Sequence, residues 1–204
     1  MARPSRRMQQ AELADFRRRQ LLKAAIKLFG AKGYHVTTIR DIADAAEVSV
    51  GMIYQYFEDK EDLLSSAIME ILDSYIREIP KAIDGETSPE KRFHAAILAY
   101  ARVIDRNRDS AAIGYRTSWA LRKDRLAVVF RKEQETAGMI RRCVDACIAA
   151  KVFREVDAEI LTYQIIVLVH SWALNAWRLP KSLTVDDYVE RNLSVLLAPV
   201  NRQA

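Results

Sequence analysis

The spacing of apolar residues is the feature that most constrains the fold of this chain. In the segment 21–29, leucine, alanine and phenylalanine recur at intervals of three and four residues, as on one face of a helix. Apolar–polar alternation over five or more residues, which would indicate strands, is hard to find. Helix breakers are also few, with 6 glycines and 5 prolines in 204 residues. The pattern therefore predicts an all-α protein.

Capping signals divide this helical pattern into separate elements. Thr38, Ser49 and Asp59 stand where helix N-caps are expected, and Gly33 is placed to end the first helix. Residues 83–89 are rich in Gly, Thr and Ser and predict a loop. We expect helices at about residues 12–32, 39–46, 50–57, from 59 towards 80, and at 89–106, 110–123, 125–151, 157–179 and 185–197.

Composition excludes several classes of protein. Half of the residues are hydrophobic and 29% are charged, which is ordinary for a globular chain and unlike a disordered one. We find no apolar run of 18 residues and no secretory signal, so we expect a cytoplasmic protein without contact with a membrane. The only two cysteines, Cys143 and Cys147, rule out a disulfide scaffold. Because no other ligand has a suitable spacing, we interpret them as core residues, with no metal and no cofactor.

Positive charge is concentrated at the N-terminus. Residues 1–40 contain ten Lys/Arg and two acidic residues, a local charge of +8, whereas the remainder has 22 basic and 25 acidic residues. This asymmetry indicates that the N-terminal region meets a polyanion, with nucleic acid as the first choice and an anionic membrane surface as the alternative. We predict a basic flexible leader at 1–11, in which Arg3, Arg6 and Arg7 either enter a minor groove or remain solvated.

Residues 38–57 carry the functional motif. Two short helices joined by about three residues form a helix-turn-helix, whose second helix fits the major groove of DNA. Ile39, Ile42 and Ala43 anchor the first helix, and Ile53 with Phe57 anchors the second. We therefore expect a DNA-binding domain at 12–64, followed by a second helical domain at 65–204.

The segment from Leu21 to Leu64 resembles the DNA-binding domain of TetR-family transcriptional repressors. The matching features are Ala24-Ala25 with Leu28-Phe29, Lys32-Gly33-Tyr34, Thr37 to Ala43, Val48-Ser49, Gly51 to Phe57 and Asp59 to Leu64. The resemblance implies an N-terminal three-helix DNA-binding domain with a C-terminal ligand-binding and dimerisation domain. It also implies a dimer that binds double-stranded DNA at a palindromic operator and responds to a small molecule.

The resemblance assigns DNA contacts residue by residue. The second short helix would be the recognition helix, in which Gln55 reaches a base edge and Tyr54 a thymine methyl or a phosphate. Tyr56 and Lys60 would contact phosphates, and Thr38 with Arg40 would flank the same DNA backbone. The alternative for Tyr54 and Tyr56 is partial burial in the domain core, but DNA contact is favoured because Ile53 and Phe57 already supply the inward face. One departure is Val50, because this position is often Lys or Arg in the family and valine donates no hydrogen bond. The predicted DNA-binding residues are Thr38, Arg40, Ser49, Val50, Gly51, Met52, Tyr54, Gln55, Tyr56 and Lys60.

The segment 160–177 is apolar on nearly every side. A helix that is apolar on all sides must be buried more fully than a helix at the periphery of a monomer. The family resemblance implies that it is buried in a four-helix interface between two subunits. The predicted interface residues are Leu161, Ile165, Leu168, Trp172, Ala176, Leu193, Leu196 and Leu197.

Polar residues that interrupt this apolar region predict an effector site. Each has a structural alternative, since His170 also fits a core histidine and Arg116 a surface residue. The predicted effector-binding residues are Tyr100, Arg116, Trp119, Tyr163, Gln164, Val167, His170 and Ser171. The segment 170–179 faintly resembles family members tied to fatty-acid metabolism, which favours a lipophilic effector such as an acyl-CoA or a fatty acid.

Two other functions are weighed against this one. An enzyme is not favoured, because the sequence contains no phosphate-binding glycine loop, no HExxH, no GxSxG and no convincing nucleophile–base pair. A protein adaptor that does not bind DNA is disfavoured by the intact Tyr54, Tyr56 and Lys60.

Overall fold

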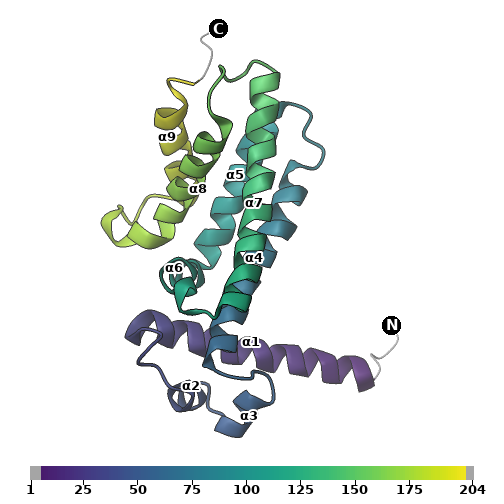
Figure 1. The fold of residues 1–204 in the computed structure, drawn as a ribbon, viewed down its shortest axis with the longest axis vertical. Coiled ribbons are helices and arrows are strands. Elements are labelled where there is room, and N and C mark those ends of the chain that lie inside the picture. The colour runs from purple at the N-terminus through teal and green to yellow at the C-terminus, as the bar shows by residue number, and fades with distance from the viewer. Residues whose placement is uncertain (1–5, 201–204) are drawn as a thin grey trace.

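The computed structural model describes residues 6–200, and in that range all regular structure is helical. Figure 1 shows a small group of helices at one end, from which longer helices extend to the other end. The helices are α1 (Arg6–Lys32), α2 (Ile39–Ala45), α3 (Val50–Tyr54), α4 (Lys60–Ile83), α5 (Pro89–Arg106), α6 (Arg108–Thr117), η1 (Ser118–Ala120), α7 (Lys123–Ala149), α8 (Ala158–Asn175), η2 (Ala176–Arg178) and α9 (Val185–Leu197).

Helices α1 to α3 pack around a compact core of their own. The buried residues of this core are Leu21, Leu22, Ala25, Phe29, Ile42, Ala43, Ile53, Phe57, Leu63 and Leu64. The last two belong to the first turn of α4, which is capped by the Asp59 carboxylate accepting from the Asp62 amide at 2.6 Å. Because α4 then continues to Ile83, the same helix serves both domains.

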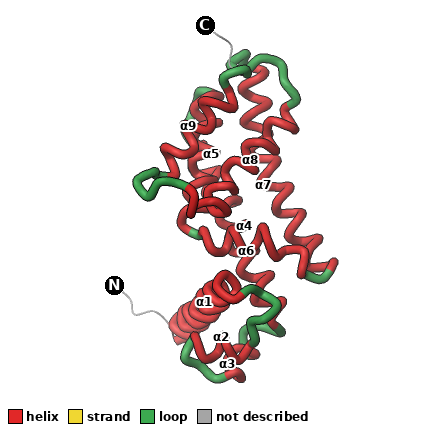
Figure 2. The backbone as a smooth tube through the Cα atoms, turned by 90° about the vertical axis from the view of Figure 1, so that its left-hand side faces the viewer, coloured by secondary structure: helices red, strands yellow, loops and turns green. Residues whose placement is uncertain are grey.

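The larger domain is organised around α5. This helix packs against α4, α7, α8 and α9, and its inward residues, such as Phe93, Ile97 and Ile104, are fully buried. Helix α6 lies where the two domains meet, in contact with α1, α4 and α8 (Figure 2). The larger domain therefore contacts the smaller one through α6, and the two share α4.

Four predicted boundaries require correction. The helix expected at 110–123 ends at Thr117 and is followed by η1. The flexible leader at 1–11 is wrong for residues 6–11, because α1 begins at Arg6 and residues 8–13 contain only good helix formers. Arg3 lies outside the described residues. Helix α3 ends at Tyr54, and residues 55–57 form a turn with hydrogen bonds back to Met52 and Ile53. The helix expected to end at 179 ends at Asn175 and is followed by η2.

Candidate DNA-binding surface and effector cavity

The helix-turn-helix is fixed by local hydrogen bonds that the sequence encodes. Thr38 Oγ1 accepts from the Asp41 amide at 3.1 Å, and the Asp41 carboxylate accepts from the Thr38 amide at 2.8 Å. This is the predicted capping box, with Asp in the place of the usual Glu or Gln. The Thr38 hydroxyl also donates to the Asp41 carboxylate, at 2.7 Å. These two hydrogen bonds donated by the Thr38 hydroxyl and amide hold the pKa of Asp41 at about 2, so the box stays formed at neutral pH. Ser49 caps α3 in the same way, accepting from the Met52 amide at 3.2 Å.

The turn between the two helices sets their relative orientation. Glu47 adopts a left-handed conformation with φ 57°, and the Val48 amide donates to the Ala43 carbonyl at 3.0 Å. This turn directs Ile53 into the core, where it is completely buried. Because Ile53 and Phe57 provide the inward face, the neighbouring residues of α3 point out of the domain.

The outward face of α3 presents the predicted DNA-binding residues. Tyr54 is 56% exposed and Val50 37% exposed, while Met52 and Tyr56 are half-buried. A Cβ atom placed on Gly51 would lie 3.8 Å from the Ser49 hydroxyl, which is ordinary contact, so packing of the free protein does not require glycine there. The remaining exposed members of the predicted set are Thr38, Arg40, Ser49 and Gln55.

Lys60 has a different role from the predicted phosphate contact. Its ammonium group donates to the carbonyls of Tyr34, His35 and Thr37 at 2.9, 3.2 and 2.9 Å, and lies 4.5 Å from the centre of the Tyr34 ring. These three bonds engage all the donors of the ammonium group. Lys60 is therefore a structural clip that ties the start of α4 to the loop before α2.

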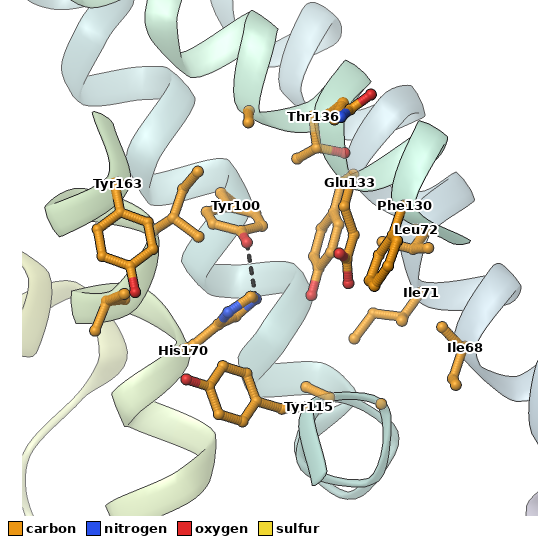
Figure 3. A pocket seen from close by; sticks show the side chains of 17 residues that line it. Ile68, Ile71, Leu72, Tyr100, Tyr115, Phe130, Glu133, Thr136, Tyr163 and His170 are labelled. Carbon is orange, nitrogen blue, oxygen red and sulfur yellow. Dashed lines mark hydrogen bonds between the residues drawn. The ribbon is translucent and has the colours of Figure 1, made fainter. Parts of the chain in front are cut away.

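A cavity of about 440 Å³ lies in the larger domain, bounded by α4, α5, α6, α7 and α8 (Figure 3). Most of its surface is aliphatic or aromatic, with a small number of polar groups, which is typical of a small-molecule site. Its lining residues are Ile68, Ile71, Leu72, Tyr75, Tyr100, Ala111, Gly114, Tyr115, Phe130, Glu133, Gln134, Thr136, Ala137, Tyr163, Ile166, Val167 and His170.

Tyr100 and His170 form the polar centre of the cavity. The Tyr100 hydroxyl lies 2.8 Å from His170 Nε2, and the ring of Tyr115 packs edge-on against the imidazole (Figure 3). Burial lowers the pKa of His170 to about 4 and raises that of Tyr100 well above its ordinary value. Both groups are therefore neutral at pH 7 and act as hydrogen-bonding groups.

The structure brings together half of the predicted effector residues. Tyr100, Tyr163, Val167 and His170 line the cavity, whereas four other predicted residues do not: Arg116, Trp119, Gln164 and Ser171. Gln164 and Ser171 each follow a lining residue of α8, and one step along a helix turns a side chain by about 100°. Trp119 is 74% exposed and packs against Phe130, which itself lines the cavity.

Sequence reasoning missed the contribution of α4 and α7. Ile68, Tyr75 and Phe130 occupy inward positions of two amphipathic helices, where aliphatic and aromatic residues resemble any packed face. Glu133 is exposed and borders the cavity from α7. The signal available was Glu133, an acidic residue close to the apolar positions of α7. Only packing distinguishes a cavity wall from a filled core.

Most predicted dimer-interface residues are buried within their own chain, which corrects this assignment. Helix α8 is covered by α5, α6, α7 and α9, so a second subunit is not needed to shield these faces. Trp172, for example, donates from Nε1 to the Asp105 carboxylate at 2.7 Å. The exposures are 6% for Leu161, 0% for Ile165, 3% for Trp172, 1% for Leu193 and 3% for Leu197. Leu168 and Leu196 are half-buried, and the side chain of Ala176 is outside the described part.

A different set of apolar residues on α8, η2 and α9 faces outwards. Helices α8 and α9 lie together along one side of the molecule (Figure 1). The exposures are 55% for Ile160, 64% for Tyr163, 37% for Val167, 81% for Trp177 and 76% for Val195.

The remaining sequence features do not form a site. Cys143 and Cys147 are buried free thiols in α7, whose pKa values are raised by burial, to about 12 for Cys147. Across residues 6–200 there is no cluster of three or more potential metal-ligating side chains. In the same range, no helix has the length and apolar character needed to cross a membrane.

Comparison with known proteins gives consistent matches over most of the chain. The family model of bacterial regulatory proteins of the tetR family matches residues 21–67, and that of the tetracyclin repressor-like C-terminal domain matches residues 86–177. The HTH-type transcriptional regulator HbdR of Aromatoleum sp. (strain CIB) is 41% identical over 188 residues, which are 92% of this chain and 82% of that protein.

Solved structures share the same fold. A tetR-family regulatory protein from Rhodococcus RHA1 superposes with a TM-score of 0.83 and 25% identity, covering 92% of this chain and 98% of that chain. AibR, solved in complex with isovaleryl coenzyme A and operator DNA, superposes with a TM-score of 0.77 and 18% identity, covering 88% and 97%.

Proposed function

This chain belongs to the tetR family of bacterial transcriptional regulators, and we propose that it is a repressor released from a palindromic operator by a small lipophilic effector. The family and its relatives are DNA-binding regulators and not enzymes. Such a regulator acts in the cytoplasm, where the bacterial chromosome lies.

The observation that carries the DNA-binding proposal is the outward face of α3. A short helix capped at Ser49 projects Val50, Tyr54 and Gln55 out of the domain, while Ile53 anchors it from behind. In the major groove these side chains would meet base edges, with Arg40, Thr38 and Tyr56 beside the phosphates. Because Val50 donates no hydrogen bond, Gln55 is the main candidate for direct base reading.

The outward apolar residues of α8, η2 and α9 support a dimer. Ile160, Tyr163, Trp177 and Val195 would leave an apolar surface in water if the chain were a monomer. Packing this side against its copy around a two-fold axis would bury these residues and present two α3 helices to one palindrome.

The cavity of the larger domain supports an effector of small lipophilic type. Its aliphatic and aromatic walls suit an acyl chain, and AibR, which shares the fold, was solved with isovaleryl coenzyme A. An acyl thioester is therefore our proposed effector class. It would act by binding better to the conformation that does not fit DNA, which shifts the population away from the operator-binding state.

Fluorescence anisotropy with the full-length protein tests this proposal. The DNA that flanks its own gene is compared with scrambled DNA across a salt series. We expect tight binding to the flanking DNA at two chains per site, reversed by an acyl-CoA. Equal, weak and strongly salt-dependent binding to both DNAs would mean that only the basic N-terminal region is acting.

A pair of matched glycine variants tests whether α3 enters the groove. Gly51→Ala keeps the free protein stable because its Cβ meets nothing closer than 3.8 Å, yet it obstructs close approach to DNA. Gly30→Ala is the control, since that helical position has equal clearance at 3.9 Å and lies in α1. Weaker operator binding by Gly51→Ala alone is the expected result, and equal affinities would place the DNA on another surface.

A further inference from the structure

The walls of the effector cavity carry very little charge. Of the described residues that line it, Glu133 alone bears a formal charge at pH 7, because no Lys or Arg is among them and His170 is neutral. The other polar lining groups are hydroxyls and one amide. The cavity therefore has a negative electrostatic character and offers no countercharge to an anion.

The Glu133 carboxylate has no protein partner among the described residues. Its neighbour in sequence, Lys132, is engaged by Asp73 of α4, and no hydrogen bond or ion pair within residues 6–200 involves Glu133. Loss of water around the carboxyl group raises its pKa, with burial as the cause. A ligand that covers this carboxylate must offer it hydrogen bonds in place of those from solvent.

Glu133 lies close to the polar centre of the cavity. Burial raises the pKa of the Tyr75 and Tyr100 hydroxyls, and the charge of Glu133 adds to the rise in both. Figure 3 shows Glu133 projecting from α7 and His170 from α8, on opposite sides of the open space. A molecule placed between these two helices therefore meets the carboxylate on one side and neutral aromatic groups on the other.

We propose that Glu133 determines effector specificity, and that the part of the effector inside the cavity is uncharged and donates a hydroxyl hydrogen bond to its carboxylate. This inference rests on the proposed role of the cavity as the effector site. A free fatty acid would bring a second negative charge beside the Glu133 carboxylate, and the two like charges would repel each other. An acyl thioester whose acyl chain carries a hydroxyl would avoid this repulsion and supply the donor, with its phosphate groups outside the cavity.

Four eight-carbon probes test the inference by isothermal titration calorimetry at pH 7.5. They are octan-1-ol, methyl octanoate, octanoate and octylammonium, and they share a chain while differing in charge and in hydrogen-bond donor. For the full-length protein we expect octan-1-ol to bind about tenfold or more tightly than octanoate, from one hydrogen bond to a charged acceptor. Methyl octanoate, which is neutral without a donor, should fall between them.

Two variants assign the effect to Glu133. Glu133→Gln should reduce the preference for octan-1-ol over octanoate about tenfold. Glu135→Gln should behave as the wild type, because this residue, which is exposed on the same helix as Glu133, does not line the cavity. Thermal melting of both variants checks that they are folded.

The outcomes separate this inference from the function on which it rests. Octanoate binding as tightly as octan-1-ol, or an unchanged preference in Glu133→Gln, would overturn the specificity inference alone. If octylammonium bound most tightly, the proposal of an uncharged ligand would be wrong, and the cavity would select a cation. Absence of binding by all four probes to folded protein would contradict the lipophilic effector itself.

Discussion

The Arg125 guanidinium, at the start of α7, donates to the Asp59 carboxylate at 3.2 Å. Asp59 is the residue that caps α4 directly after the recognition helix. A second nitrogen of Arg125 donates to Glu58 at 3.1 Å, and the Arg122 amide donates to Glu61 at 2.7 Å. These contacts fasten the N-terminal end of α7 to the DNA-binding domain.

The same helix also forms a wall of the cavity. Phe130 and Glu133 lie one to two turns beyond Arg125 on α7. A shift of α7 caused by a ligand would therefore be transmitted to the segment that follows α3. The contact between Arg125 and Asp59 is a candidate route for coupling between effector and operator.

Replacing Arg125 should weaken this coupling. We expect Arg125→Gln to keep its affinity for the effector but to lose about 1 kcal/mol of coupling, roughly fivefold in operator release. The measurement is operator affinity by anisotropy with and without saturating effector. Arg131→Gln, at an exposed position of the same helix, is the control. If the two variants released DNA to the same extent, the coupling would have to pass through α6 or α4.

Lys60 and Tyr54 should respond differently to substitution. Lys60→Ala removes three hydrogen bonds to backbone carbonyls, so we expect a loss of about 1–3 kcal/mol in unfolding free energy and a melting temperature several degrees lower. Tyr54→Ala, at an exposed position, should weaken operator binding and leave the melting temperature unchanged. A Lys60 variant with unchanged stability and weakened DNA binding would restore its role as a phosphate contact.

Acid should destabilise the protein through His170. Its pKa is about 4 in the folded chain against 6.5 in the unfolded chain, so the unfolded state binds the proton first as the pH falls. Stability is therefore full above pH 6.5 and declines towards pH 4, by up to about 3 kcal/mol. The raised pKa of Glu133 acts in the opposite direction, because the folded state then binds this proton before the unfolded state as the pH falls. The measurement is the melting temperature across pH 4–8.

The contribution of His170 is the difference between the pH profiles of the melting temperature of the wild type and of a His170 variant. His170→Gln should flatten the decline below pH 6.5, because glutamine does not titrate. His35→Gln, at an exposed position of the DNA-binding domain, should retain the wild-type profile. Identical profiles for His170→Gln and wild type would contradict a buried neutral imidazole.

A charge on the outward side of α9 should prevent dimer formation. Val195 is 76% exposed, so Val195→Glu is compatible with the folded monomer, whereas at a two-fold interface it would bury unpaired carboxylates. We expect a monomer by size-exclusion chromatography with light scattering. Val128→Glu, at a 42% exposed position on α7, should remain a dimer. Dimers of equal stability in both variants would place the interface elsewhere.

The sequence alone determined the helix-turn-helix, because its determinants are local. The capping residues Thr38 and Ser49 act within one turn of their helices, and the apolar spacing around Ile53 defines the inward face. Family resemblance then extended this motif to a DNA-binding domain without reference to any distant part of the chain. Local reasoning could not find the internal hydrogen bonds of Lys60, because its three acceptors lie 23 to 26 residues away.

The tertiary structure alone decided how α8 is used. Its sequence is apolar on nearly every side, so periodicity could not distinguish the faces directed at the core, the cavity and the outside. Packing against α5, α6, α7 and α9 buried Ile165 and Trp172, turned His170 towards Tyr100 and left Ile160 in solvent. Glu133 lines the same cavity from α7, and this too depends on how the helices pack. A cavity wall is defined by what the neighbouring helices leave unfilled, and that depends on contacts between residues far apart in the sequence.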